Sequence, residues 1–259
     1  MKRVEGYYQL KCNFHTHFIE AFGEYPEIMV NAYHRAGYDC IALTEHYDLV
    51  EDLNFAKRAQ EYAQKRYSSD FLVIPGLEIG LKDSAYPGAM RDLLALFVDS
   101  HISRNLMSEG MDLDTSLNIV LNEIHQKNGI AIIAHDHRTL SHWDGESTPD
   151  WIWDHREDKE IDGWEIGNGS GYYEKLSDGS NCMLSHPEES VNERYCVTAN
   201  SDAHNKDDMR AKNICYTYVF AYERTIEGVK DALLNRRTIA YCNGAAYGLS
   251  KWLNHHQDY

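Results

Sequence analysis

Short apolar runs alternate with stretches of helical periodicity along almost the whole chain. The runs with the length and composition of strands are Leu10–Phe14, Cys40–Thr44, Phe71–Pro75, Leu93–Val98, Ile130–Ala134, Gly163–Gly167, Tyr195–Asn200, Ile214–Phe220 and Thr238–Cys242. The stretches that predict helices are Pro26–Ala36, Asp52–Tyr67, Asp114–Asn128, Pro187–Glu193 and Thr225–Asn235. Because strands that alternate with helices form parallel sheets or barrels, the pattern predicts an α/β protein with a mostly parallel sheet or barrel.

The predicted strands are nearly continuous in apolar residues, which is typical of strands buried on both faces. No repeat, low-complexity tract or linker divides the sequence, so we expect one domain over residues 1–259. Two stretches predict long loops: Ser141–Asp158 is rich in Trp, Asp and His, and Asn168–Asn181 is rich in Gly and Ser. We expect these loops to set the substrate specificity.

Side chains of the kinds that bind metals follow the apolar runs, where the predicted strands end. In chain order they are His15 and His17, Glu45 and His46, Glu78, then His135, Asp136, His137 and Arg138, then Glu165 and Asn168, and finally Ser201, Asp202 and His204. The carboxyl ends of barrel strands meet at one face, and that face carries the active site in α/β barrels. The sequence therefore predicts that these residues gather in one site.

The spacing within these groups favours shared metal ligands. Residues i and i+2 of a strand point to the same side, so His15 and His17 are placed as neighbouring ligands, and Asp202 and His204 repeat that geometry. Glu78 follows a tight Pro-Gly exit, and its two carboxylate oxygens suit a bridge between two cations. Each motif by itself is weak evidence, whereas their order at the ends of successive strands predicts a metal site.

The composition limits the partners of the protein. Lys and Arg number 25 against 41 Asp and Glu, a net charge of −16, which argues against bulk nucleic-acid binding because phosphate backbones need a basic surface. A small phosphorylated substrate is still allowed, since a metal ion inverts the local field. The 14 histidines add further donors for metal ions.

The sequence shows neither a secretory signal nor a membrane segment. No apolar region follows the first residues, and no run approaches the ~20 apolar residues of a membrane helix. The six cysteines form no CxxC pair and are interpreted as reduced thiols. These observations predict a cytoplasmic protein that does not bind membranes.

Five motifs, taken together and in order, resemble the PHP (polymerase and histidinol phosphatase) superfamily. They are Asn13–His17, Ile41–His46, Ile74–Glu78, Ile133–His135 and Asn200–His204, and the resemblance runs from about Lys11 to Tyr241. The segments Gly37–His46, Gly163–Gly169 and Leu233–Tyr241 are similar to the stand-alone, carbaryl-hydrolase-like branch of that superfamily. The resemblance implies a distorted (β/α)7 TIM-like barrel of the PHP type that holds two or three divalent ions.

The resemblance also implies roles for individual residues. It places His15, His17, Glu78 and Asp202 around a first ion, His135 with Glu78 at a second, and His46 with His204 at a third. Arg138 stands where family members place an arginine near the substrate phosphate, and we expect Asn168 to bind substrate as well.

The chain departs from the family pattern at three positions. Phe22 stands where an Asp that can bind metal follows the HxH motif, with Glu20 and Glu24 nearby. Thr-Glu-His replaces the family's Thr-Asp-His. A further His near the fourth strand has no assigned equivalent, since Asp92 occupies one plausible alignment and His101 lies beyond the strand.

The combined interpretation predicts a metal-dependent phosphoesterase that hydrolyses a small phosphorylated metabolite. In this mechanism a metal-activated hydroxide attacks phosphorus in line, Asp202 orients the hydroxide and accepts its proton, Glu78 bridges the ions, and Arg138 binds phosphate oxygens. Mixed imidazole and carboxylate ligands suit zinc, manganese and iron alike. Two alternatives stay open: a metallohydrolase of a carboxyl ester, carbamate or amide on the same metal site, and a non-catalytic, metal-stabilised binding protein.

Overall fold

The structure of the chain is a computed structural model. It describes residues 3–18, 25–85, 91–103, 106–108, 110–135, 151–169, 183–184, 191–206, 215–242 and 244–255. Most of the predicted loops 141–158 and 168–181 lie outside these residues.

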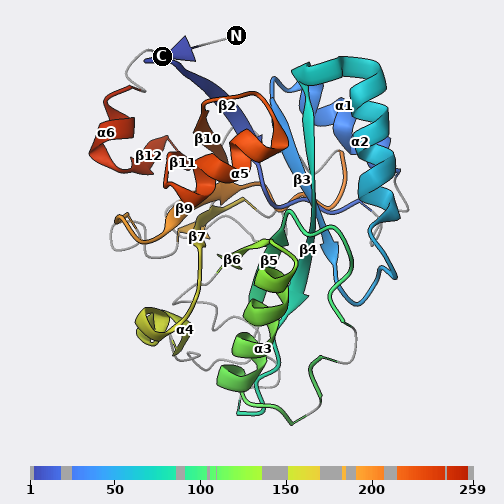
Figure 1. The fold of residues 1–259 in the computed structure, drawn as a ribbon, viewed down its shortest axis with the longest axis vertical. Coiled ribbons are helices and arrows are strands. Elements are labelled where there is room, and N and C mark those ends of the chain that lie inside the picture. Colours follow the sequence, from blue (N-terminus) through green and yellow to red (C-terminus); the bar gives the residue numbers. More distant parts are fainter. Residues whose placement is uncertain are drawn as a thin grey trace.

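A nearly closed, barrel-shaped sheet forms the centre of the molecule (Figure 1). Within the described residues its wall consists of β2 (Tyr7–Asn13), β3 (Cys40–His46), β4 (Leu72–Gly80), β5 (Asp92–Leu96), β6 (Ile130–Ala134), β7 (Gly163–Asn168) and β9 (Cys196–Asn200), in that order around the sheet. The chain after β9 returns to the chain after β2, where Thr16 bridges to Ala203 and His17 N donates to Ala203 O at 2.8 Å. The predicted distorted TIM-like barrel is therefore confirmed.

The direction of two strands differs from the mostly parallel sheet that we expected. β5 runs antiparallel to both β4 and β6, and β10 (Cys215–Ala221) runs antiparallel to β2. No helical pattern separates the runs of β4 and β5 in the sequence, and a parallel return would need a long crossover. The chain therefore turns back directly, and β5 begins at the edge of the barrel where β4 ends.

Further short strands extend the sheet beyond the barrel. β10 pairs with β11 (Thr238–Cys242), which pairs with β12 (Ala245–Gly248), while β1 (Arg3–Val4) pairs with β2 and β8 (Met183–Leu184) with β7. The short helix α6 (Ser250–Leu253) follows β12, on the flank opposite α1 and α2 (Figure 1). β12 and α6 carry no clear sequence pattern and were not predicted.

The longer helices occupy the regions where helical periodicity predicts them. They are α1 (Pro26–Arg35), α2 (Asn54–Tyr67), α3 (Leu113–Gln126) and α5 (Ile226–Leu234), with short turns at α4 (Trp151–Asp154), η1 (Ser68–Asp70) and η2 (Arg156–Asp158). Asp112 caps α3 by accepting from Thr115 N, and Thr225 caps α5 by accepting from Gly228 N. The predicted helix Pro187–Glu193 lies mostly outside the described residues, and residues 191–193 are not helical.

Two apolar layers hold the barrel together. The inner layer takes alternate residues of the strands, such as Leu10 and Cys12 on β2, Ala42 on β3 and Leu94 on β5, and α5 packs on it through Val229. The intervening residues point outward and pack with α1, α2 and α3 in a second cluster. The alternation follows from the two-residue period of a strand.

Four of the cysteines, Cys12, Cys40, Cys196 and Cys215, are free and buried, as the interpretation of reduced thiols requires. Cys242 takes part in a disulfide, which departs from that interpretation. Across the described ranges of the chain, none of the helices combines the length and apolarity that a bilayer crossing requires.

Candidate metal centre

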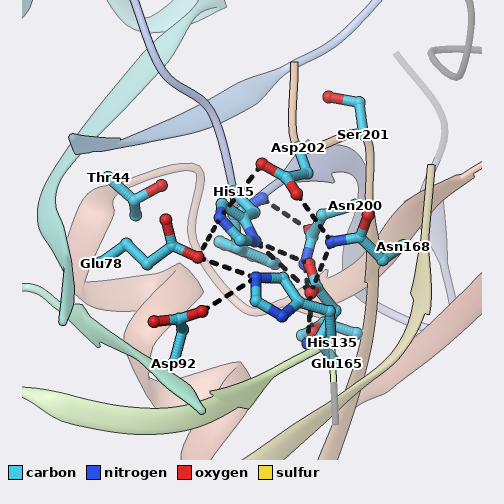
Figure 2. A network of polar contacts seen from close by, with 12 residues as sticks. His15, Thr44, Glu78, Asp92, His135, Glu165, Asn168, Asn200, Ser201 and Asp202 are labelled. Atoms are coloured by element: carbon cyan, nitrogen blue, oxygen red, sulfur yellow. Dashed lines mark hydrogen bonds and ion pairs between the residues drawn. The ribbon is translucent and has the colours of Figure 1, made fainter. Parts of the chain in front are cut away.

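Polar side chains replace apolar ones at the last inward-facing positions of the barrel strands. On β3 the inward-facing residues after Ala42 are Thr44 and His46. On β4 the last inward-facing side chain is that of Glu78. β5 runs the other way, so its first residue, Asp92, lies at the same edge. The strand register thus brings side chains from neighbouring strands to one end of the barrel interior (Figure 2).

His15 and His17 follow β2, and their Nε2 atoms lie 3.1 Å apart. Glu78 Oε1 is 3.1 Å from His15 Nε2, and Glu78 Oε2 is 3.3 Å from His17 Nε2. Asp202 Oδ1 lies 3.4 Å and 3.3 Å from the same two nitrogens. Four side chains from three parts of the sequence therefore converge on one point.

Glu78 also connects this group to two further imidazoles. His135 Nε2 is 2.9 Å from Glu78 Oε1 and 3.7 Å from Asp92 Oδ2. His46 Nδ1 is 3.2 Å from Glu78 Oε2. The Glu78 carboxylate is thus the common member of the cluster, as a bridging ligand would be.

Three imidazoles gather in the outer part of the cluster. The ring of His17 lies against those of His46 and His204, with centroid separations of 4.3 Å and 4.4 Å, and the centroids of His46 and His204 are 5.9 Å apart. One nitrogen from each of these three rings lies within 4.8 Å of the others. His46 is the most exposed of them, with 36% of its side chain open to solvent, so this part of the cluster faces outward.

Two residues of the cluster hold unusual backbone conformations. His135 has φ = 28° and Asp202 has φ = 51°, values that residues with a side chain rarely adopt. Such conformations cost of order 1–3 kcal/mol and tend to occur at functional sites. Both residues lie just after a strand and contribute side chains to the cluster.

A buried carboxylate, Glu165 on β7, supports the cluster from behind. Its oxygens lie 3.1 Å and 3.4 Å from His15 Nδ1, and they accept hydrogen bonds from His135 N, Asn200 Nδ2 and Asn168 Nδ2. Asn168 Nδ2 also donates to Asp202 Oδ2 at 3.2 Å (Figure 2). A β-bulge between Glu165 and Gly167 shifts the register of β7 at this position.

Glu45 supports His17 in a similar way. Its side chain is fully buried, Oε1 lies 3.4 Å from His17 Nδ1, and Oε2 accepts from Phe18 N at 3.0 Å. The glutamate of the Thr-Glu-His motif therefore contacts the second ring nitrogen of a neighbouring histidine.

Burial and charge pull the pKa values of the cluster in opposite directions. Burial opposes the charged form of His15, but Asp202, Glu78 and Glu165 outweigh it and raise its pKa well above 6.5. Burial alone would raise the pKa of Glu78, yet the surrounding imidazoles, first of all His15, hold it well below 4.5. Burial, with the charge of Glu78, raises the pKa of Asp92 to about 6. Without a cation, protons on the imidazoles balance the carboxylates, and a bound cation would replace those protons.

The spacing of the donors fits divalent metal ions. Bonds of ~2.0–2.1 Å to a tetrahedral ion separate its ligands by about 3.3–3.4 Å. His15 Nε2 and His17 Nε2 lie 3.1 Å from each other and 3.1–3.4 Å from the nearest oxygens of Glu78 and Asp202. Asp202 Oδ1 is buried and accepts no hydrogen bond within the described part of the chain, and coordination would satisfy it.

The structure brings together all the residues that the sequence analysis expected to bind metal: His15, His17, His46, Glu78, His135, Asp202 and His204. Their role as ligands stays a prediction. Asp92 joins the group from β5, whereas His101 lies elsewhere, with its ring stacked on Tyr47 and Nε2 3.2 Å from Tyr47 O.

The predicted substrate-binding residues are less well defined. Arg138 lies outside the described residues, as do Phe22, Glu20 and Glu24. Asn168 is 1% exposed and directs its amide at Glu165 and Asp202, so contact with substrate stays a prediction for it.

Sequence reasoning missed the supporting roles of Glu165, Glu45 and Asn200. Glu45 and Asn200 occur at the ends of predicted strands, which is a usable signal, whereas Glu165 lies within one. Nothing in the local sequence indicates which histidine each one contacts, because Glu165 meets a residue 150 positions away.

The site and the fold together define a TIM-like barrel with a buried histidine and carboxylate cluster at one end. No protein-family model and no curated protein matches the sequence. Among solved structures, the chain is similar to a two-domain protein from Bacteroides vulgatus that contains a predicted PHP-like metal-dependent phosphoesterase. The TM-score is 0.71 and the identity 23%, over 98% of this chain and 70% of that one.

A second similar structure is the lesion-specific endonuclease PfuEndoQ from Pyrococcus furiosus, with a TM-score of 0.51 and 15% identity over 88% of this chain and 56% of that chain. At such identities the likeness shows the fold. The chain thus shares the barrel fold of these proteins, while its place in the PHP superfamily and in the carbaryl-hydrolase-like branch stays a prediction.

Proposed function

We propose that this chain is a metal-dependent phosphoesterase that hydrolyses a small phosphorylated metabolite, and that residues 1–259 form one such domain. The observation that carries the proposal is the position of Glu78, whose two oxygens face separate imidazole groups within one buried cluster. A bridging carboxylate of this kind suits adjacent cations, which stabilise the attacking and leaving oxygens of an in-line displacement. The PHP-like fold supports the choice of a phosphoester.

The metal ligands in this proposal are the clustered residues. His15, His17, Glu78 and Asp202 would hold one ion, His135 with Glu78 a second, and His46 with His204 a third. We propose two or three divalent ions, with zinc, manganese and iron as the candidates. When bound, such ions lower the pKa of a coordinated water and neutralise charge on the phosphoryl group.

The protein's own residues supply position and proton transfer. Asp202 Oδ2 is held by the Asn168 amide, so this carboxylate is oriented to hold the attacking water and accept its proton. Glu165 fixes His15 through Nδ1, which leaves Nε2 directed at the centre of the cluster. Arg138 is proposed to bind the phosphate oxygens through its planar fork.

A hydrolysis panel on the metal-loaded protein tests this function. It contains sugar phosphates, nucleotides, 3′,5′-bisphosphates, a single-stranded oligonucleotide and p-nitrophenyl esters of phosphate and of acetate. We expect turnover of at least one small phosphomonoester and loss of that turnover on chelation.

Each other outcome selects a different function. Cleavage of the carboxyl ester without phosphatase activity would refute the phosphoesterase in favour of the ester, carbamate or amide hydrolase. Turnover of the oligonucleotide alone would overturn the small-molecule substrate. No metal-dependent turnover of any substrate would favour a metal-stabilised binding protein.

A further inference from the structure

The two ends of the cluster differ in their donor chemistry. At one end, His17, His46 and His204 offer three imidazoles, and the only carboxylate oxygen within 3.3 Å of His46 Nδ1 among the described contacts is Oε2 of the shared Glu78, at 3.2 Å. At the other, Glu78 and Asp92 offer two carboxylates beside the single imidazole of His135. The donor atoms of each set lie within 4.8 Å of one another, so each set is compact enough to bind one ion.

Asp92 owes its position to the reversed direction of β5. It pairs with Gly80 on β4 and with Ala134 on β6, between the strand ends that lead to Glu78 and His135. A Cβ atom at position 80 would lie 3.3 Å from Asp92 Oδ1, so a glycine there leaves room for the carboxylate. Only 15% of the Asp92 side chain is exposed, and Oδ2 is 3.7 Å from His135 Nε2.

The preferences of metal ions match this asymmetry. Imidazole donors suit Zn²⁺, whereas carboxylate oxygens suit harder ions such as Mn²⁺. Glu78 is shared by both ends, and Asp92 adds a second carboxylate at the His135 end, which neutralises the charge of a divalent ion more fully than imidazoles do. Zn²⁺ binds most sites more tightly than Mn²⁺. The two ends are therefore compared by the ratio of the Mn²⁺ affinity to the Zn²⁺ affinity at each end.

We propose that the two ends of the centre select different metals, with Mn²⁺ favoured by Glu78, Asp92 and His135 relative to the Zn²⁺-selective end at His17, His46 and His204. Asp92 is the residue that sets this difference. The inference rests on the metal centre of the proposed function and adds to it that the centre is heterometallic.

The test measures metal affinity rather than turnover. Metal-free protein is loaded with two equivalents of Zn²⁺, one for the central ligands His15, His17, Glu78 and Asp202 and one for the imidazole end. It is then titrated with Mn²⁺, and free Mn²⁺ is followed by electron paramagnetic resonance. Asp92→Asn is expected to weaken Mn²⁺ binding at least about tenfold and to leave both Zn²⁺ affinities unchanged. Asp92→His is expected to shift the Mn²⁺ position toward Zn²⁺. His204→Gln is the matched variant, expected to weaken the second Zn²⁺ and to leave Mn²⁺ binding intact.

Unchanged Mn²⁺ affinity in Asp92→Asn, with a folded protein by circular dichroism, would overturn the inference. So would equal losses of both metals in Asp92→Asn and His204→Gln. The result is separable from the phosphoesterase proposal. A wild-type protein that binds Zn²⁺ and Mn²⁺ as described but hydrolyses no phosphoester refutes only the function, whereas phosphatase activity with unaltered Mn²⁺ affinity in Asp92→Asn refutes only this inference.

Discussion

The imidazole of His15 is held at both of its nitrogens. Nδ1 faces Glu165, and Nε2 faces Glu78 and Asp202. A carboxylate on Nδ1 favours a proton there, which leaves the lone pair of Nε2 for a metal ion. Glu165 is therefore a positioning residue that acts through His15 and through the backbone of His135.

Glu165→Gln tests this positioning role. Glu165 contacts the N–H groups of His135, Asn168 and Asn200 and the Nδ1 atom of His15. The NH₂ group of the introduced amide is itself a donor, so it could not accept these hydrogen bonds. We expect the affinity for the most tightly bound metal to fall by about 10- to 100-fold, measured by competition with a chelator.

The matched control is Asp39→Asn at the other end of β3, where Asp39 accepts from Lys11 N at 2.8 Å and pairs with Arg224. This variant is expected to keep its metal affinity even if it loses stability. Equal affinities in Glu165→Gln and in the wild type would contradict the positioning role.

At the scale of elements, the strands were predicted better than their directions. Apolar runs predicted the barrel strands because burial on both faces demands apolar side chains. The run of β3 was predicted to end at Thr44, yet the strand continues to His46, since its last inward residues serve the site rather than the core. Strand direction depends on the connection between strands, which is why the reversal of β5 was not predicted.

One contact between elements gives a pH-dependent contribution to stability. His125 on α3 places Nε2 3.0 Å from Asp162 Oδ2, just before β7, and this hydrogen bond raises the pKa of His125 above 6.5. Because the pKa of His125 is raised in the folded state, the His125–Asp162 contact adds its full contribution to the free energy of unfolding below pH 6.5. That contribution is lost as the pH rises through the raised pKa of His125.

His125→Gln should therefore lower the free energy of unfolding by on the order of 1 kcal/mol or less at pH 5.5, and by a smaller amount at pH 9. Urea unfolding at the two pH values measures the difference. Asp162→Asn, which retains an acceptor for Ala131 N, should show the same trend. A loss that is equal at both pH values would show that the contact is only steric.

At the scale of the whole molecule, part of the net charge of −16 has a place in the fold. Glu45, Glu78, Glu165 and Asp202 are buried in or beside the cluster, and Asp92 is partly buried there. Buried carboxylates need a cation or a proton to balance them. The acidic composition is thus explained in part by this buried cluster, in addition to a solvated surface.

The sequence was sufficient to predict which strand ends carry the clustered histidines and carboxylates, because the motifs occur in order along the chain. It was not sufficient to predict their relative arrangement. The approach of His17 to His46 and His204, and the sharing of Glu78, depend on the curvature of the barrel and on the backbone turns at His135 and Asp202. These are properties of the closed sheet that no local pattern contains.

The central claim is that this cluster is a metal centre that hydrolyses phosphoesters, and His17→Ala tests it most directly. His17 contacts both Glu78 and Asp202, and its ring also stacks on two further histidines. The measurement is elemental analysis of purified wild-type and variant protein, together with the rate on the best phosphomonoester. We predict more than one equivalent of divalent metal in the wild type, reduced metal content in the variant and a large loss of turnover. Unchanged metal content and an unchanged rate in His17→Ala would contradict the account.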